Sequence, residues 1–168
     1  MPALTRPFLL AIALITPILV AAPLPALAQQ IAFGGIRGDT SAPVEVTADS
    51  LAVNQADGSA TFTGNVVVGQ GDMRLSAATV RVEYGAGGTS KIERLHASGG
   101  VTLVNATEAA EAREAVYTIA SGQIVLTGDV LLTQGQNVMS GQKLTVDLKT
   151  GTGAMDGRVR TILQPGGN

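Results

Sequence analysis

Two segments of this chain carry nearly the same ten residues, FTGNVVVGQG at 62–71 and LTGDVLLTQG at 126–135. A weaker form, a glycine close before a valine, recurs in SGGV at 98–101 and DGRV at 156–159. A small residue also follows each of the first three glycines at a constant distance. The sequence therefore predicts four copies of one unit of roughly 29 residues. The repeat glycines are Gly64, Gly99, Gly128 and Gly157.

Apolar and polar residues alternate within each unit. Phe62 and Val66 share one parity with the glycine between them, whereas Thr63 and Asn65 have the other parity. A period of two indicates a strand with one buried face. In the other run of each unit the apolar parity slips by one residue, as it does in 75–82. Such a slip predicts a bend or bulge in that run, and the glycines predict a matching kink in its neighbour.

Turn-like segments separate the runs, and they decide the predicted fold. QADGS at 55–59, TIASGQ at 118–123 and KTGTG at 149–153 are typical of antiparallel hairpins. We therefore predict an all-β protein, a twisted antiparallel β-jelly roll built from the four repeats. A parallel β-solenoid is the alternative, because a period near 30 also suits one coil per repeat.

Two segments depart from the simplest form of the repeat. Extra residues in the second unit fall in the glycine-rich stretch 84–91, where a longer turn is tolerated at little entropic cost. The stretch 105–117 is rich in alanine and glutamate, so its local propensity is helical. The repeat places 105–117 on a strand, and we prefer that interpretation because tertiary context often overrides propensity.

The N-terminus has the pattern of a secretory signal peptide. Arg6 precedes an apolar run, and small residues follow at 26–28, so we predict cleavage after residue 28. A retained transmembrane anchor is the alternative, but prolines interrupt the run, which is shorter than the roughly 20 residues that a spanning helix needs. The remaining chain divides into a flexible segment at 29–42, one β-domain at 43–163 and a short tail at 164–168.

Few residues suggest chemistry. The chain has 13 acidic and 11 basic residues and a net charge of −2, which argues against nucleic-acid binding. It has no cysteine, so it forms no disulfide. The single histidine, His96, alternates with inward residues and is predicted to face solvent without a nucleophile nearby. The acidic series Glu108, Glu111 and Glu114 is better explained as a solvated face than as a metal site. We expect no catalysis, no metal and no cofactor.

The predicted interior is mostly aliphatic. Only three phenylalanines, two tyrosines and no tryptophan occur in the whole chain. An interior of valine, leucine, isoleucine, alanine and glycine can be a thin packed core. It can also leave a groove whose walls resemble lipid tails. Composition leaves both possibilities open.

Three segments carry a resemblance to a known family: ADSLAV at 48–53, ATFTGNVVV at 60–68 and RLSAATVRVEY at 74–84. They resemble the OstA-like domain of the periplasmic LptA family, over about residues 43–148. The resemblance implies a jelly roll in the periplasm that binds the lipid A acyl chains of lipopolysaccharide between its sheets. It also implies transfer from an inner-membrane complex with an LptC-like protein to an outer-membrane LptD-like translocon, and head-to-tail self-association.

On this interpretation the lipid would lie against the inward positions of the strands. These are Val44, Val46, Phe62, Val66, Val68, Leu75, Val80, Val82, Leu95, Val101, Leu103, Tyr117, Leu126, Val130, Leu132, Leu144 and Val146.

The ends of the repeat array are predicted to carry the assembly. The segment 43–53 would offer one strand edge and 155–163 the other, and matched edges permit strand addition between copies. Three other functions remain open: a membrane-anchored LptC-like protein, a structural β-repeat protein with a packed interior, and an exported carbohydrate-active enzyme. The enzyme is the least favoured, because the repeat supplies no carboxylates in register.

Overall fold

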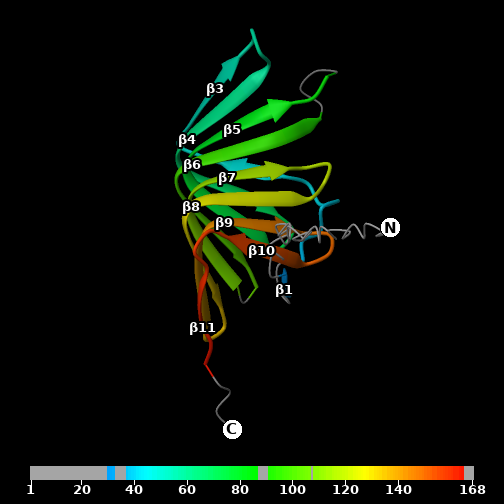
Figure 1. Cartoon of the computed structure of the whole chain (residues 1–168). Coiled ribbons are helices and arrows are strands. Elements are labelled where there is room, and N and C mark those ends of the chain that lie inside the picture. The colour runs from blue at the N-terminus through cyan, green and yellow to red at the C-terminus, as the bar shows by residue number, and fades with distance from the viewer. Residues whose placement is uncertain (1–29, 33–36, 87–90, 107, 165–168) are drawn as a thin grey trace, which may run out of the picture.

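The computed structural model describes residues 30–32, 37–86, 91–106 and 108–164, and all the regular elements in these ranges are strands. Figure 1 shows the strands following one another along the sheet. Their bounds are β1 Gln30–Ala32, β2 Glu45–Thr47, β3 Ser50–Asn54, β4 Ser59–Gln70, β5 Met73–Tyr84, β6 Ile92–Asn105, β7 Glu108–Thr118, β8 Gln123–Gln134, β9 Asn137–Asp147, β10 Thr152–Asp156 and β11 Arg160–Ile162.

Every strand pairing is antiparallel, and the strands form one sheet in the order β1-β10-β9-β8-β7-β6-β5-β4-β2. Two short strands lie beside this path: β3 pairs with β4, and β11 pairs with β9. The predicted antiparallel all-β fold is confirmed, and the pairing excludes the parallel solenoid. Most of segment 105–117 lies on a strand, as expected: β6 ends at Asn105, and β7 runs from Glu108 to Thr118.

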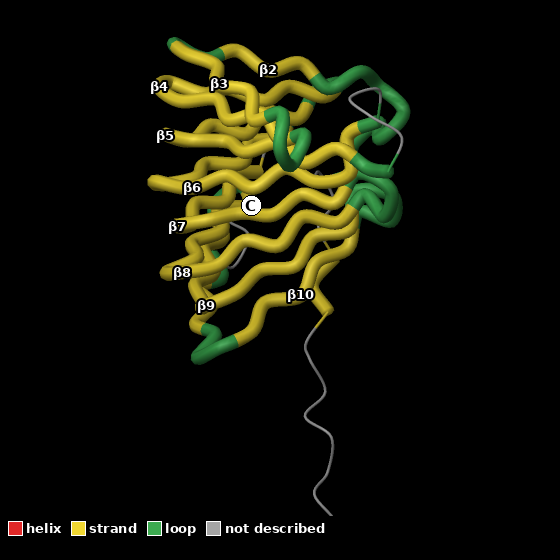
Figure 2. The backbone as a smooth tube through the Cα atoms, turned by 90° about the horizontal axis from the view of Figure 1, so that it is seen from above, coloured by secondary structure: helices red, strands yellow, loops and turns green. Residues whose placement is uncertain are grey.

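Each long strand bends at one level of the sheet. The register shifts between Thr63 and Val66 of β4, and it shifts at the corresponding point of every following pair up to β8 and β9. Figure 2 shows the strands side by side along the whole molecule. The aligned irregularities form a continuous corner, as the slip in hydrophobic parity predicted.

The repeat glycines lie at this corner and have left-handed backbone angles. Gly64, Gly99, Gly128 and Gly157 have φ between 82° and 85°. At Gly99 a β-carbon would lie 2.7 Å from the Cβ of Ala78 on β5. At Gly128 it would lie 2.9 Å from the Cβ of Arg113. Glycine is required there both for its backbone freedom and for the close approach of the neighbouring strand.

The corner divides the sheet into two wings. Wing A contains β1, β3, β10, the N-terminal halves of β4, β6 and β8, and the C-terminal halves of β5, β7 and β9. Wing B contains β2, β11 and the remaining halves of the long strands. Both layers of the molecule therefore belong to one hydrogen-bonded sheet. The structure does not itself divide the sheet into units, so the count of four repeats stays a prediction.

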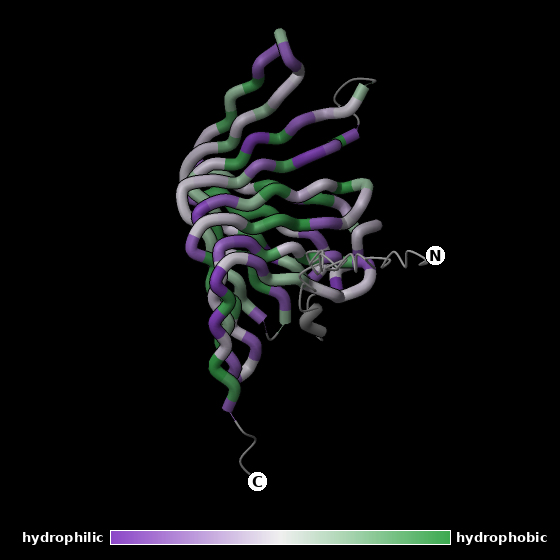
Figure 3. The backbone as a smooth tube through the Cα atoms, viewed as in Figure 1, coloured by the Kyte–Doolittle hydropathy of each residue, from purple (hydrophilic) through white to green (hydrophobic). Residues whose placement is uncertain are grey.

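One hydrophobic core fills the space between the wings. Val66 and Leu103 of wing B belong to the same buried cluster as Leu95 and Leu126 of wing A. Figure 3 shows hydrophobic and hydrophilic residues alternating along the strands, which is why only one face of each wing contributes to the core. The wings therefore pack together through the inward residues.

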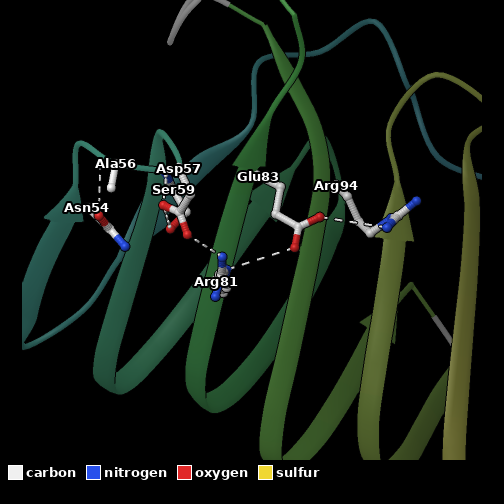
Figure 4. A network of polar contacts seen from close by, with 7 residues as sticks. All are labelled: Asn54, Ala56, Asp57, Ser59, Arg81, Glu83 and Arg94. Atoms are coloured by element: carbon white, nitrogen blue, oxygen red, sulfur yellow. Dashed lines mark hydrogen bonds and ion pairs between the residues drawn. The ribbon is translucent and has the colours of Figure 1, made fainter.

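Charged side chains link the outer face of wing A. Arg81 on β5 forms an ion pair of 2.8 Å with Asp57 in the turn after β3, and it lies 3.8 Å from Glu83. Glu83 in turn lies 3.7 Å from Arg94 on β6 (Figure 4). The side chains are between 42% and 47% exposed, so each pair contributes little stability. The series connects the β3–β4 hairpin to its neighbours.

The segment 29–42 lies partly within the described residues, and its flexibility stays a prediction. Strand β1 pairs with β10, with Gln30 opposite Ala154. Residues 37–42 then form hydrogen bonds with both wings before β2 begins. The predicted signal peptide and the tail after residue 164 lie outside the described residues.

Candidate functional site

The candidate site is the apolar inner face between the wings. All the residues that the sequence predicted to face inward are either in the buried cluster or packed against it. Most are buried, whereas Val44, Val46 and Phe62 are half-buried. The structure therefore brings the whole predicted set to one face, and their contact with lipid stays a prediction.

The end of the interior beside β2 and β3 is less covered than the middle of the sheet. Phe62 on β4 and Val46 on β2 are only partly buried there. On β3 the apolar side chains of Leu51 and Val53 are 56% and 61% exposed. In the middle of the sheet, by contrast, Leu126 and Ile124 are fully buried. The apolar face thus continues from a closed middle to an open end.

Three methionines in the core were missed by the sequence analysis. Met73, Met139 and Met155 are at most 4% exposed. Met73 opens β5 and shares the parity of Leu75, so the alternation could have identified it. Methionine is unbranched and adapts to irregular space, which makes this interior able to repack around a guest.

A buried polar pair joins the wings near the ends of the strands. The hydroxyl of Tyr117 in wing A donates a hydrogen bond of 2.6 Å to Oε1 of Gln70 in wing B. Burial raises the pKa of the Tyr117 hydroxyl above its usual 10.0, and the bond to Gln70 offsets part of that rise. The hydroxyl therefore stays protonated and able to donate at physiological pH.

The amide of Gln70 also contacts the N-terminal segment. Its Nε2 donates to the carbonyl oxygens of Thr40 and Ala42, at 3.2 and 3.0 Å. Asn105 Nδ2 donates to the carbonyl oxygen of Arg37 at 2.9 Å. The sequence signal for these side chains was weak: Gln70 continues the inward parity of Val66 and Val68, but its partners are far away in the chain.

No catalytic constellation assembles among the residues that the structure describes. His96 lies 3.6 Å from Glu114 on the outer face, and its side chain is 44% exposed. The strand places Glu108 on the inner face, where it is 2% exposed and accepts a hydrogen bond from Gln134, and leaves Glu111 exposed. The three glutamates therefore do not converge, and the described residues contain no acidic, histidine or cysteine group able to hold a metal ion.

Comparison with known proteins assigns the family. A family model described as LptA/(LptD N-terminal domain) LPS transport protein matches residues 45–152. The chain belongs to this family of lipopolysaccharide transport proteins. The resemblance noted in the sequence is thus confirmed, and the role that the family description states is transport.

Curated relatives match over most of their length. An uncharacterized protein of Rhizobium meliloti is 33% identical over 141 residues, which is 78% of this chain and 76% of that protein. The lipopolysaccharide export system protein LptA of Escherichia coli K12 is 29% identical and covers 73% of this chain and 69% of its own length. LptA of Haemophilus influenzae is 27% identical, with 83% and 86% covered.

A solved structure supports the fold. LptH of Pseudomonas aeruginosa, described as the LptA-homologous periplasmic component of the lipopolysaccharide transport device, superposes with a TM-score of 0.68 at 22% identity. The match covers 76% of this chain and 99% of that one. The bent antiparallel sheet is therefore the fold that this family member shares with LptH. In the part of the chain that the structure describes, no helix is long and apolar enough to span a membrane.

Proposed function

We propose that this protein carries lipopolysaccharide across the periplasm, from an inner-membrane complex with an LptC-like protein to an outer-membrane LptD-like translocon. The lipid A acyl chains would lie between the wings. The observation that carries the proposal is the continuous apolar inner face, which leads from the buried middle of the sheet to the partly open end at Phe62 and Val46.

The physical reason is the cost of exposing lipid chains to water. Each methylene group removed from water contributes about 0.8 kcal/mol, so an acyl chain strongly favours an apolar path. The aliphatic walls offer that environment without directional contacts that would hold the chain at one point. The three core methionines supply side chains that can rearrange as a chain passes.

The two ends of the sheet favour head-to-tail assembly as part of this function. Strands β2 and β3 form one end, and β10 and β11 lie near the other. The predicted edge segment 43–53 spans β2 and most of β3. The predicted edge segment 155–163 holds β11 and only the end of β10, whose outer edge is covered by β1. Strand addition between copies would continue the sheet and extend the apolar face from one molecule to the next. No catalytic group is needed for this function.

Photocrosslinking from paired neighbouring positions tests the lipid path. A photoreactive phenylalanine derivative at Phe62 should label purified lipopolysaccharide, whereas the same group at exposed Thr63 should not. The pairs Val101 with Thr102 and Leu126 with Thr127 repeat the comparison in the middle of the sheet. Equal labelling from inward and outward positions would refute the proposed path, and absent labelling from all inward positions would refute lipid binding in the interior.

A further inference from the structure

The N-terminal segment crosses from one wing to the other. Strand β1 lies on β10 in wing A, and β2 lies on β4 in wing B. The described residues between these strands, 37–44, therefore pass over the side of the molecule where the strand ends of the two wings face each other. Figure 2 shows this segment beyond β2, along the ends of the strands and away from the corner. We call residues 37–44 the strap.

Hydrogen bonds hold the strap to both wings. The amide of Gly38 donates to the carbonyl oxygen of Leu148, at the end of β9 in wing A, at 3.2 Å. On the other side, Asn105 and Gln70 of wing B donate to carbonyl oxygens of the strap. Because Gln70 also accepts from Tyr117 of wing A, one amide joins the strap and both wings.

None of the strap residues is fully buried. Arg37, Asp39, Ser41 and Pro43 are exposed, and they alternate with half-buried neighbours. Its hydrogen bonds to the wings are accepted mainly by its backbone carbonyls, and Val44, at its end, is the strap residue that packs against the apolar core. Segments with few buried apolar contacts are the ones that open locally without global unfolding. The strap can therefore detach while the wings stay folded.

We propose that the strap is a displaceable closure over the apolar interior, and that it must leave Gln70 and Asn105 before lipid acyl chains enter between the wings. This inference rests on the proposed function. The acyl chains would occupy space between the wings that inward side chains now fill. The wings must separate on the strap side to admit them, because the corner joins the wings on the other side. A strap bonded to both wings opposes that separation.

The absence of cysteine from the chain allows the strap to be locked specifically. A β-carbon on Gly38 would lie 3.6 Å from the Cβ of Leu148, within the roughly 3.5–4.5 Å range of disulfides. The variant Gly38→Cys/Leu148→Cys would thus tie the strap to wing A. A second lock, Asp39→Cys/Gly71→Cys, has the same 3.6 Å separation, ties the strap to the β4–β5 turn of wing B and leaves the core intact.

The experiment compares each double variant in its oxidised and reduced forms for retention of fluorescent lipopolysaccharide. We expect oxidised Asp39→Cys/Gly71→Cys, which holds the strap on wing B, to bind at least about tenfold more weakly than the same protein with reductant, a change that is readily resolved. The oxidised Gly38→Cys/Leu148→Cys form is the matched control and should bind like its reduced form, because a strap tied to wing A can still leave Gln70 and Asn105. Binding of lipopolysaccharide by the wild-type chain should not change when reductant is added. The single variant Leu148→Cys controls for the smaller core side chain.

The outcomes separate the strap from the proposed function. If oxidised Asp39→Cys/Gly71→Cys binds as well as its reduced form, the strap inference is wrong and lipopolysaccharide binding stands. If the wild-type chain and all reduced variants retain no lipopolysaccharide, the proposed function fails and the inference fails with it. Weak binding by oxidised Asp39→Cys/Gly71→Cys, restored by reductant while the circular dichroism spectrum is the same in both forms, supports the inference, because a defect of folding would change that spectrum.

Discussion

Substitution of the adjacent glycines Gly99 and Gly100 tests how the corner is built. Both have left-handed backbone angles, with φ of 83° and 87°. An alanine β-carbon at Gly99 would lie 2.7 Å from the Cβ of Ala78, whereas nothing lies within 4 Å of one at Gly100. The variant Gly100→Ala therefore adds only backbone strain, and Gly99→Ala adds the same strain together with a collision.

The two contributions have different sizes. A left-handed conformation costs a residue other than glycine about 1–2 kcal/mol. An extra carbon forced into a packed contact costs about 1–3 kcal/mol more, and Ala78 cannot relieve it by rotating its side chain. We expect the free energy of unfolding to fall by about 1–2 kcal/mol in Gly100→Ala, and by roughly 2–5 kcal/mol in Gly99→Ala.

Urea unfolding followed by circular dichroism measures both values, and an unchanged urea dependence shows that the folded states are comparable. The further variant Ala78→Gly/Gly99→Ala should recover most of the difference, because it removes the atom that is struck. Equal destabilisation by the two single alanine substitutions would refute the close approach, as would an absence of recovery in the double variant.

Three further predictions concern the wings and the edges. Burial raises the pKa of Tyr117, so its stabilising contribution is complete below the unfolded value of 10.0 and is lost as pH rises through the higher folded value. In Tyr117→Phe the free energy of unfolding should no longer fall for this reason at alkaline pH. At pH 8 it should be about 1–3 kcal/mol lower than in the wild type, because Gln70 loses its donor; urea titrations at a series of pH values measure both effects. The hydroxyl of Ser59 lowers the pKa of Asp57, so stability from this carboxylate is present above pH 3.8 and is lost as pH falls through the lower folded value. In Asp57→Asn the free energy of unfolding should not show this decrease at acid pH. Arg81→Ala should lower the free energy of unfolding by less than about 1 kcal/mol at neutral pH, because the ion pair is exposed. A proline scan of 160–162 should abolish concentration-dependent self-association in size-exclusion chromatography at one or more positions with the fold intact, and unchanged profiles throughout would count against strand addition at β11.

The corner shows which parts of the fold are readable from the sequence. The alternation around Phe62 and Leu126 identifies the strands and their inward face, and the parity slip with the repeat glycines places the bend. These signals are local, because a strand's side chains alternate wherever one face is buried. Every residue of the predicted inward set lies on the buried face, because one sheet with one buried face imposes the alternation throughout, although the core methionines were left out of that set.

The parts that could not be predicted depend on contacts between distant residues. Both layers belong to one sheet because each long strand continues through the corner and pairs with the same neighbour on both sides of it, which the parity slip alone does not reveal. The strap is the clearer case. Its bonds join Arg37 to Asn105 and Thr40 to Gln70 through backbone carbonyls, which leave no pattern in the residue types.

The alignment of the corner across the sheet has a consequence for how this fold can change in length. One residue added within a strand would move that strand's bend out of line with its neighbours and reverse the faces of the residues beyond it. Residues added between two strands disturb neither, as the longer separation of β5, which ends at Tyr84, from β6, which begins at Ile92, illustrates. We expect natural length variation among related chains to fall at the tips or in whole hairpins, so that evolution can lengthen the molecule without altering its profile.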